Sequence, residues 1–312
     1  MKALPLVVAA AALACEAPMR EQYVLADREA LPEGVAFDAS AGTFFATAVQ
    51  GGVVTRFSPL GQESVFHRAG DPSVSFMGAH VDDERGLLWL CEVALTAAPR
   101  SRVLALRVGD GRLARAVELG EAYCNDVVTD AAGTVYATDS LQPRVFRVDA
   151  AGVTVFADDP RFAPQLAGLG LTGLDVSPDG ESLLVAKLAP PTLFRVRLAD
   201  PADVVAVQFT GDAFGRPGDP RFPGPDGVAF VGEALYVASD GGVQQLRFLG
   251  DGHTRAEVRT TTAVPPGLTS LVDAAGRLYA IDGDAFRVLH AQKQADPPFA
   301  VVHIDTGLFD GP

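Results

Sequence analysis

One short pattern recurs six times along the chain, and it constrains the fold more than any other feature. Each copy runs from a strand start through alternating apolar residues to a turn and a second apolar stretch. Successive copies begin 42 to 54 residues apart. Their first residues are Glu33, Gly78, Asn125, Thr172, Asp226 and Leu268. A self-similar period of this length is typical of β-propeller blades.

The composition of each copy indicates strands rather than helices. Apolar residues alternate with period two, β-branched and aromatic types are frequent, and Asp and Gly mark the turns. A third apolar run follows each pair, and a weaker fourth often comes after it. The third runs are VVTRFS, RVLALRV, RVFRVD, LFRVRL, VQQLRFL and, in the last copy, FRVLHA at 286–291. Four strands in six units predict an all-β, six-bladed β-propeller with four-stranded antiparallel blades.

A propeller must close its ring, and the two ends of the chain offer strands for this. The candidates for the outermost strand of the last blade are QYVLA at 22–26 and FAVVHI at 299–304. Either segment or both can serve, and the pattern does not choose between them.

The first fifteen residues differ from the rest. Lys2 is the only charged residue before Glu16, and residues 3–14 are apolar. This run is too short to span a membrane and has the pattern of an export signal. We therefore expect a signal peptide at 1–15 and a single propeller domain at 16–312, exported to the periplasm.

The end of this signal also resembles a bacterial lipobox. The segment Ala12-Leu13-Ala14-Cys15 has the form in which the cysteine is lipidated after cleavage, although Ala12 stands where Leu is usual. This predicts a lipid anchor at Cys15 to the cell envelope as the alternative to a free periplasmic protein. No later apolar run is long enough to span a bilayer.

Charge limits the partners. The chain has 39 acidic and 25 basic residues, and its formal net charge is -14. A strongly acidic surface repels phosphate backbones, so nucleic acid is excluded as an expected partner. A small-molecule substrate or ligand is the expected one.

Two cysteines remain once Cys15 is assigned to the signal. Cys91 and Cys124 form an even pair in an oxidising compartment, which allows a disulfide. Cys91 ends the second strand of the second copy and Cys124 opens the third copy, so the two are expected near each other. The alternatives are a disulfide between adjacent blades and two separate buried thiols. No spacing of His and Cys suggests zinc.

The first strand of each blade lines the central channel, so the residues that begin these strands converge at one mouth. Glu33, Asn125 and Asp226 are thereby expected around a common axis. Carboxylates crowded at one site repel one another, and a hard cation relieves the repulsion. Calcium prefers such oxygen ligands. The alternative is that these side chains only hydrogen-bond the backbone at strand starts.

Four segments resemble one known family. They are PEGVAFD at 32–38, NDVVTDAAGTVYATDS at 125–140, LTGLDVSPDGESLLVA at 171–186 and PDGVAF at 225–230. At these spacings they are similar to the senescence-marker-protein and gluconolactonase family, among the calcium-dependent lactonases and phosphotriesterases. The resemblance covers the chain beyond residue 15. It implies a six-bladed propeller with a divalent metal, most often calcium, at the channel mouth.

The resemblance also implies roles for individual residues. Glu33, Asn125 and Asp226 match metal ligands of the family. Thr172 stands where the family has a fourth-blade asparagine, and its hydroxyl is a shorter and weaker donor than a carboxamide. Asp226 is then the expected catalytic base as well as a ligand, and Asn125 the residue that orients the substrate.

His80 is a further candidate for the site. It lies two residues after Gly78, on the same face of the expected strand, which directs it towards the channel. There it would serve as an acid, a base or a substrate-binding group. The alternative is a hydrogen-bonded histidine of the core.

Together these observations predict an exported, metal-dependent hydrolase of a lactone or a related ester. The alternative is a non-catalytic envelope β-propeller that binds a small molecule or a protein. Retention of Glu33, Asn125 and Asp226 favours the enzyme, and the change at Thr172 favours the binding protein.

Overall fold

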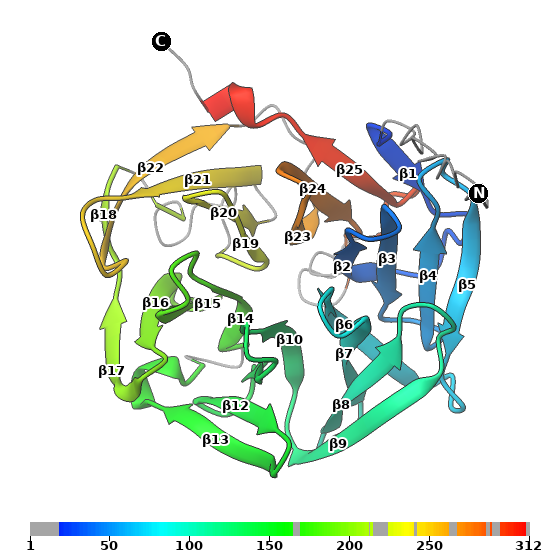
Figure 1. Ribbon diagram of the computed structural model, residues 1–312, viewed down its shortest axis with the longest axis horizontal. Helices are drawn as coiled ribbons and strands as arrows, with labels where there is room; N and C mark the ends of the chain where they lie inside the picture. Colours follow the sequence, from blue (N-terminus) through cyan, green and yellow to red (C-terminus); the bar gives the residue numbers. More distant parts are fainter. Residues whose placement is uncertain are drawn as a thin grey trace, which may run out of the picture.

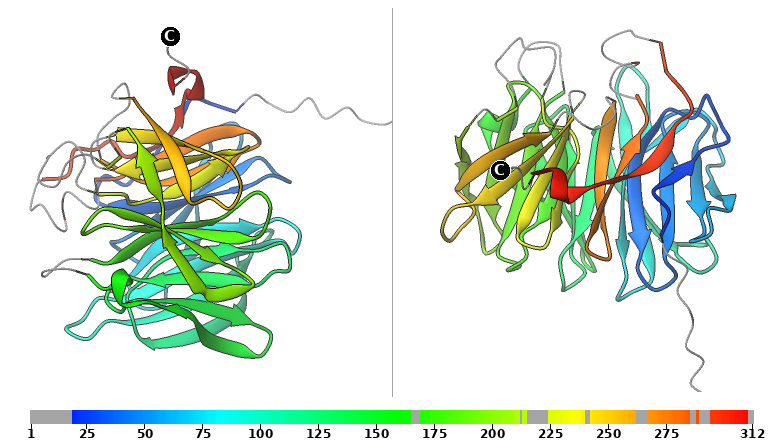
Figure 2. Two further views of the ribbon diagram at one scale, coloured as in Figure 1. Left: turned by 90° about the vertical axis from the view of Figure 1, so that its left-hand side faces the viewer. Right: turned by 90° about the horizontal axis from the view of Figure 1, so that it is seen from above.

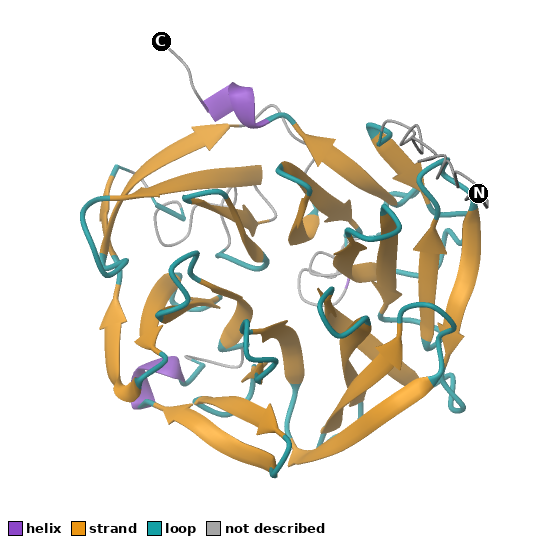
Figure 3. Cartoon of the chain, viewed as in Figure 1, coloured by secondary structure: helices purple, strands orange, loops and turns teal. Residues whose placement is uncertain are grey.

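Each of the six repeats folds into one antiparallel sheet, and the sheets are arranged around a central axis (Figure 1). The computed structural model describes residues 19–164, 169–211, 213–214, 224–239, 242–261, 267–284, 288 and 294–309. The all-β, six-bladed propeller expected from the repeat is confirmed. The described residues include two short 3-10 helices on the outside of the ring, η1 (Pro160–Phe162) and η2 (Thr306–Phe309) (Figure 3).

The first three blades follow the chain directly, with their strands in order from the axis outwards. Blade one holds β2 (Pro32–Asp38), β3 (Thr43–Ala48), β4 (Val53–Phe57) and β5 (Glu63–Arg68). Blade two holds β6 (Val74–Asp82), β7 (Leu87–Ala94), β8 (Arg100–Arg107) and β9 (Leu113–Glu121). Blade three holds β10 (Cys124–Thr129), β11 (Val135–Asp139), β12 (Arg144–Asp149) and β13 (Gly152–Asp158).

The fourth and fifth blades follow in the same way, with one addition. Blade four holds β14 (Leu171–Val176), β15 (Ser182–Lys187), β16 (Thr192–Arg197) and β17 (Asp200–Ala206). Blade five holds β19 (Val228–Val231), β20 (Ala234–Ser239), β21 (Gly242–Phe248) and β22 (Arg255–Thr261). A fifth strand, β18 (Gln208–Thr210), pairs in parallel with β22 and covers the outer edge of this blade.

Both ends of the chain close the ring. Blade six is built from β23 (Leu268–Ala274), β24 (Arg277–Asp282), β25 (Ala300–Ile304) and β1 (Gln22–Val24), in that order from the axis. The outermost strand therefore comes from the start of the chain, and Tyr23 pairs with Val301. The expectation that 286–291 supplies the third strand is wrong, because β25 holds that place beside β24.

Burial explains the order of the strands. All six residues of β3 are buried, whereas outer strands such as β5 are mostly exposed. The core lies between neighbouring sheets. At the closure, the Tyr23 ring centroid lies 4.9 Å from that of Phe44 and 6.4 Å from that of Tyr279. Burying aromatic surface there joins the first and last blades.

Seen from the side, the inner strands run from one face of the ring to the other (Figure 2). The starts of the inner strands therefore share one face, which is where the expected site residues lie. The signal at 1–15, with Cys15, lies outside the described residues. No helix among the described residues is long and apolar enough to cross a membrane.

Candidate functional site

A one-residue bulge at the start of the inner strands aims side chains into the ring. In blade one the pairing passes from Pro32 with Ala48 to Val35 with Ala46, so three steps on β2 match two on β3. The same shift occurs at the starts of β6, β10, β14 and β23. In blade five, Asp226 N–H donates to the carbonyl of Ala238, whose own N–H donates to the carbonyl of Gly227. Bulges of this kind redirect a side chain at a functional site.

The bulges define one equivalent residue in each blade, which we call the ring positions. They are Glu33, Met77, Asn125, Thr172, Asp226 and Thr269. The sequence pattern was one residue wrong in two blades, since it placed Gly78 and Leu268 in this set. Gly78 is the second bulge residue, and Leu268 precedes its bulge.

The second bulge residues bring neighbouring strands into close contact. A Cβ atom on Gly173 would lie 2.5 Å from the carbonyl oxygen of Asp226, and one on Gly227 would lie 2.5 Å from the Cα of Ser270. Gly173 N–H donates to that same carbonyl of Asp226 at 2.9 Å. Glycine is required at such approaches because any side chain would collide with backbone. The contacts form a narrow waist in the channel.

Three of the predicted ligands, Glu33, Asn125 and Asp226, line one small pocket at the ring. Glu33 is only 6% exposed, and its Oε2 has no hydrogen-bond partner among the described residues. The hydroxyl of Thr269 donates to the backbone carbonyl of Glu33 at 2.7 Å and holds the strand in place. A buried carboxylate oxygen without a partner is rare and costly.

The carboxylates of this pocket disfavour one another's charge. Burial raises the pKa of Glu33 well above its usual range, and the charges of Asp226 and Asp126 raise it further. Burial, with the charge of Asp126, raises the pKa of Asp226 to about 7. A bound cation would remove both penalties at once.

The donor set is suited to a hard cation. Two carboxylates and a carboxamide are oxygen donors of the kind that calcium prefers. The set has no imidazole or thiolate, which zinc and copper favour. The described residues contain no group of three or more His, Cys, Asp or Glu side chains arranged to hold a metal, and here the third donor is Asn125.

Thr172 occupies its ring position but does not line this pocket. Its hydroxyl donates to the carbonyl of Pro225 at 2.9 Å, directly before Asp226. The residue is fully buried. Its side chain thus links blade four to blade five.

Solved structures share this fold. The major allergen Mala s 1 of Malassezia sympodialis superposes with a TM-score of 0.73 at 16% identity, over 93% of this chain and 97% of the allergen. A luciferin-regenerating enzyme matches with a TM-score of 0.63 at 13% identity, over 89% and 92% of the two chains. A gluconolactonase from Xanthomonas campestris matches with a TM-score of 0.58 at 17% identity, over 94% and 93%.

These likenesses confirm the propeller that the sequence resemblance implied, and a gluconolactonase is among the proteins that share it. At such identities they establish the fold and leave the activity open. No protein-family model matches the chain, and no curated protein matches it.

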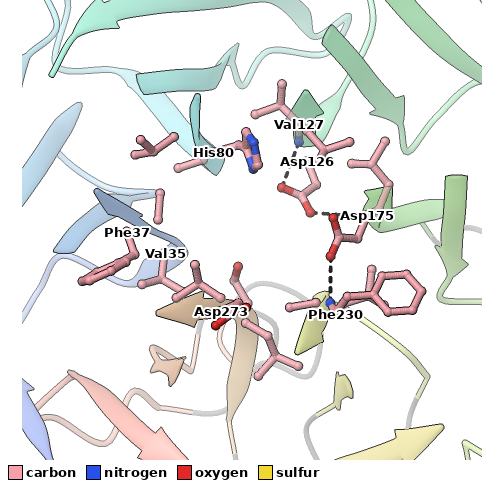
Figure 4. Close-up of a pocket in the computed structure, with 18 of the residues that line it drawn as sticks. Val35, Phe37, His80, Asp126, Val127, Asp175, Phe230 and Asp273 are labelled. Atoms are coloured by element: carbon pink, nitrogen blue, oxygen red, sulfur yellow. Dashed lines mark hydrogen bonds between the residues drawn. The ribbon is translucent and has the colours of Figure 1, made fainter. Parts of the chain in front are cut away.

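Beyond the waist, the channel opens into a cavity of about 310 Å³ (Figure 4). Four carboxylates, those of Asp83, Asp126, Asp175 and Asp273, line it, and most of the other lining residues are apolar. Asp126 accepts from the N–H groups of Val127 and Leu174, at 2.8 and 3.3 Å. Asp126 lines both this cavity and the ring pocket, and its charge acts on Glu33 and Asp226.

His80 lies in this cavity (Figure 4) and is not among the residues that line the ring pocket. Burial lowers its pKa to about 4, although the charge of Asp82 opposes the shift. The imidazole is therefore neutral at pH 7. The structure places it in the channel, as the sequence suggested, but on the side of the waist away from Glu33, Asn125 and Asp226.

Tyr123 is a residue of the ring that the sequence did not reveal. It lies two positions before Asn125 and is 7% exposed. Its hydroxyl contacts the sulfur of Met77, the ring residue of blade two, at 4.0 Å. Burial raises the pKa of this phenol, and the charges of Glu33 and Asp226 raise it further. Nothing in the segment YCND distinguishes this tyrosine from a core residue.

A disulfide joins Cys91 to Cys124 beside the ring, with their Cα atoms 5.4 Å apart. It links β7 of blade two to the start of β10 of blade three. Of the two alternatives for this pair, the structure has the bonded one. Cys124 N–H also donates to the hydroxyl of Ser101 at 3.0 Å, which fixes the backbone between Tyr123 and Asn125.

Proposed function

We propose that this chain is a divalent-cation-dependent hydrolase of lactones or related esters, with calcium as the cation. The observation that carries the proposal is the unpartnered Oε2 of Glu33, buried beside Asp226 and Asn125 at the channel mouth. A cation ligated by these three side chains would satisfy the orphaned oxygen and remove the carboxylate repulsion. The shared fold with a gluconolactonase supports the substrate class.

The chemistry divides between the cation and the chain. A bound calcium supplies Lewis acidity towards a carbonyl or phosphoryl oxygen. Asp226 lies on the same pocket, where its carboxylate would both hold the cation and take a proton from the attacking water. Asn125 is buried on the same pocket, where its amide orients the substrate. The glycine contacts at the waist hold these groups in register.

The experiment has two arms. Metal content of the purified protein is measured before and after a chelator, and calcium affinity is measured for the wild type and Glu33→Gln. Hydrolysis of a panel of lactones, aryl esters and phosphotriesters is then assayed with added calcium, with Asp226→Ala as the inactive control. Turnover of a lactone by the wild type alone supports the proposal. A metal-free protein that turns over nothing faster than Asp226→Ala refutes it.

We also propose that the chain is exported, to the periplasm or to the envelope through a lipid on Cys15. The apolar run at 3–14 supports a signal, and the Cys91–Cys124 disulfide is typical of an oxidising compartment. Mass spectrometry of protein from bacterial membranes and from periplasmic extract distinguishes the lipidated chain from the free one.

One observation favours the second candidate, a non-catalytic propeller that binds a small molecule or a protein. The Thr172 hydroxyl is engaged with the carbonyl of Pro225, so one ring position offers no ligand. The substrate panel decides between the two, because a binding protein shows no turnover with any added cation.

A further inference from the structure

The phenol hydroxyl of Tyr123 lacks a strong hydrogen-bond partner although its ring is buried. Its only partner among the described residues is the thioether of Met77 at 4.0 Å, and a thioether sulfur is a weak acceptor. Buried tyrosine hydroxyls usually find a good partner. The chain shows this elsewhere, since the Tyr236 hydroxyl accepts from Gln245 Nε2 at 2.7 Å.

The backbone of Tyr123 is held firmly in contrast to its hydroxyl. Its N–H donates to Oδ1 of Asp139 at 3.1 Å, and its carbonyl accepts from Ser140 at 2.9 Å. Asp139 is fully buried and also binds Arg144 Nε at 2.9 Å. The disulfide at Cys124 anchors the next residue. The backbone that carries the phenol is thus held at Tyr123 and at the next residue.

The Tyr123 hydroxyl lies beside Met77, which is one of the ring positions. Met77 occupies the ring position between Glu33 and Asn125, so a group against its sulfur lies at the rim of the ring. Tyr123 also lies two positions before Asn125, which lines the ring pocket. A phenol carries its proton at neutral pH, so it acts as a donor. A ligand oxygen that approaches the ring would supply the missing acceptor.

We propose that Tyr123 is a substrate-binding residue whose hydroxyl donates a hydrogen bond to the carbonyl oxygen of the ligand at the ring. The inference rests on the proposed function and adds a selection rule to it: the site prefers ligands that present an acceptor oxygen beside the ring. A donor built for an acceptor discriminates against ligands that lack one.

The test compares Tyr123→Phe with the wild type and with Tyr136→Phe. Tyr136 is a buried tyrosine of the same blade, and its hydroxyl donates to Asp130 at 3.3 Å, away from the ring pocket. With calcium-loaded protein, three quantities are measured: hydrolysis of δ-valerolactone, the dissociation constant of δ-valerolactam, and the carbonyl stretch of the bound ¹³C-labelled lactam in the infrared.

We expect Tyr123→Phe to lower kcat/KM for the lactone by about 10- to 100-fold and to weaken lactam binding about tenfold. The carbonyl stretch should move to higher frequency, which a merely structural role would not cause. The urea midpoint should stay unchanged, because the hydroxyl has no strong partner to lose. Tyr136→Phe should match the wild type in kinetics, affinity and stretch.

The outcomes separate the two proposals. If the wild type hydrolyses lactones and Tyr123→Phe does so equally well with the same carbonyl stretch, only the role of Tyr123 is overturned. If no lactone is hydrolysed but the lactam binds and loses affinity in Tyr123→Phe, the hydrolase fails and the hydrogen bond stands. If the wild type neither hydrolyses nor binds these probes, both fail. Loss of activity together with a lowered urea midpoint and an unshifted stretch also overturns the role.

Discussion

Replacing Glu33 by Gln removes one buried charge while keeping the size of the side chain. In the metal-free protein this charge lies beside Asp226 with one oxygen unpartnered. Asp226 gives the scale, since a pKa rise from 3.8 to about 7 corresponds to about 4 kcal/mol against the charged form. The amide of Gln still has to be buried, so we expect Glu33→Gln to raise the free energy of unfolding by about 1–3 kcal/mol at pH 8 without metal.

Calcium should reverse the ranking of the two proteins. At a hundred times its dissociation constant, a ligand of the folded state adds about 2.7 kcal/mol to the free energy of unfolding. Calcium should therefore add this much to the free energy of unfolding of the wild type. It should add much less to that of Glu33→Gln, because one of the two ligand carboxylates is gone. The variant is then the more stable protein in chelator and the less stable one in calcium.

A matched control is available in Glu92, which is also 6% exposed but pairs with Arg102. Arg102 is 41% exposed, so solvent partly compensates for the loss of its partner. Glu92→Gln should therefore lower the free energy of unfolding by about 1–2 kcal/mol in chelator and in calcium alike. If Glu33→Gln raises the free energy of unfolding in chelator and Glu92→Gln lowers it, then ion pairing, and not burial alone, decides how a buried glutamate affects stability.

Urea unfolding followed by circular dichroism, in chelator and in calcium at pH 8, measures all three proteins. The midpoints are compared at constant m-value. The reasoning is refuted if Glu33→Gln is destabilised in chelator to the same extent as Glu92→Gln. It is refuted equally if calcium stabilises the wild type and Glu33→Gln by the same amount.

Three further predictions concern other parts of the ring. The pKa values of Asp175 and Asp226 are raised to about 7, so the folded protein keeps protons that the unfolded chain releases. The free energy of unfolding in chelator should therefore fall as the pH rises from about 4 to 7. Urea midpoints that rise across this window would contradict the prediction. Thr172→Asn should lower the free energy of unfolding by about 1 kcal/mol, because the hydrogen bond to the Pro225 carbonyl is lost. It should also strengthen calcium binding about tenfold, as measured by calorimetry. An unchanged calcium affinity would remove position 172 from the site. Reduction of the Cys91–Cys124 disulfide should lower the free energy of unfolding by about 3–4 kcal/mol, and two reactive thiols in the denatured, unreduced protein would disprove the bond.

The fold was predictable because its signals are local. Alternation with period two, turn residues and a regular spacing all operate within one blade, so the six copies are visible in the chain. The polar character of Glu33, Asn125 and Asp226 at corresponding places in three copies also marked the ring. These residues line one pocket because each inner strand begins at the same face.

Register at the bulges was not predictable. In blade two the ring residue is Met77, one position before the Gly78 that the pattern chose, and its apolar side chain gives no sign of facing the axis. In blade six the ring residue is Thr269, one position after the Leu268 that the pattern chose. A bulge adds one residue without changing the alternation that follows. Only the pairing of Ala79 with Leu90, and of Leu271 with Ala280, shows which residue is the extra one.

By itself the sequence determined the number of blades, the two inner strands of each blade, and the blades that carry carboxylates at the channel mouth. The tertiary structure alone decided how the ring closes, since β1 and β25 are separated by most of the chain. It also decided that Cys91 and Cys124 are bonded, that His80 lies beyond the waist, and that the Tyr123 hydroxyl reaches Met77 at the ring. The disulfide and the Tyr123–Met77 contact join neighbouring blades, and ring closure joins the two ends of the chain. A repeat pattern describes the strands within one copy and carries no information about contacts between distant segments.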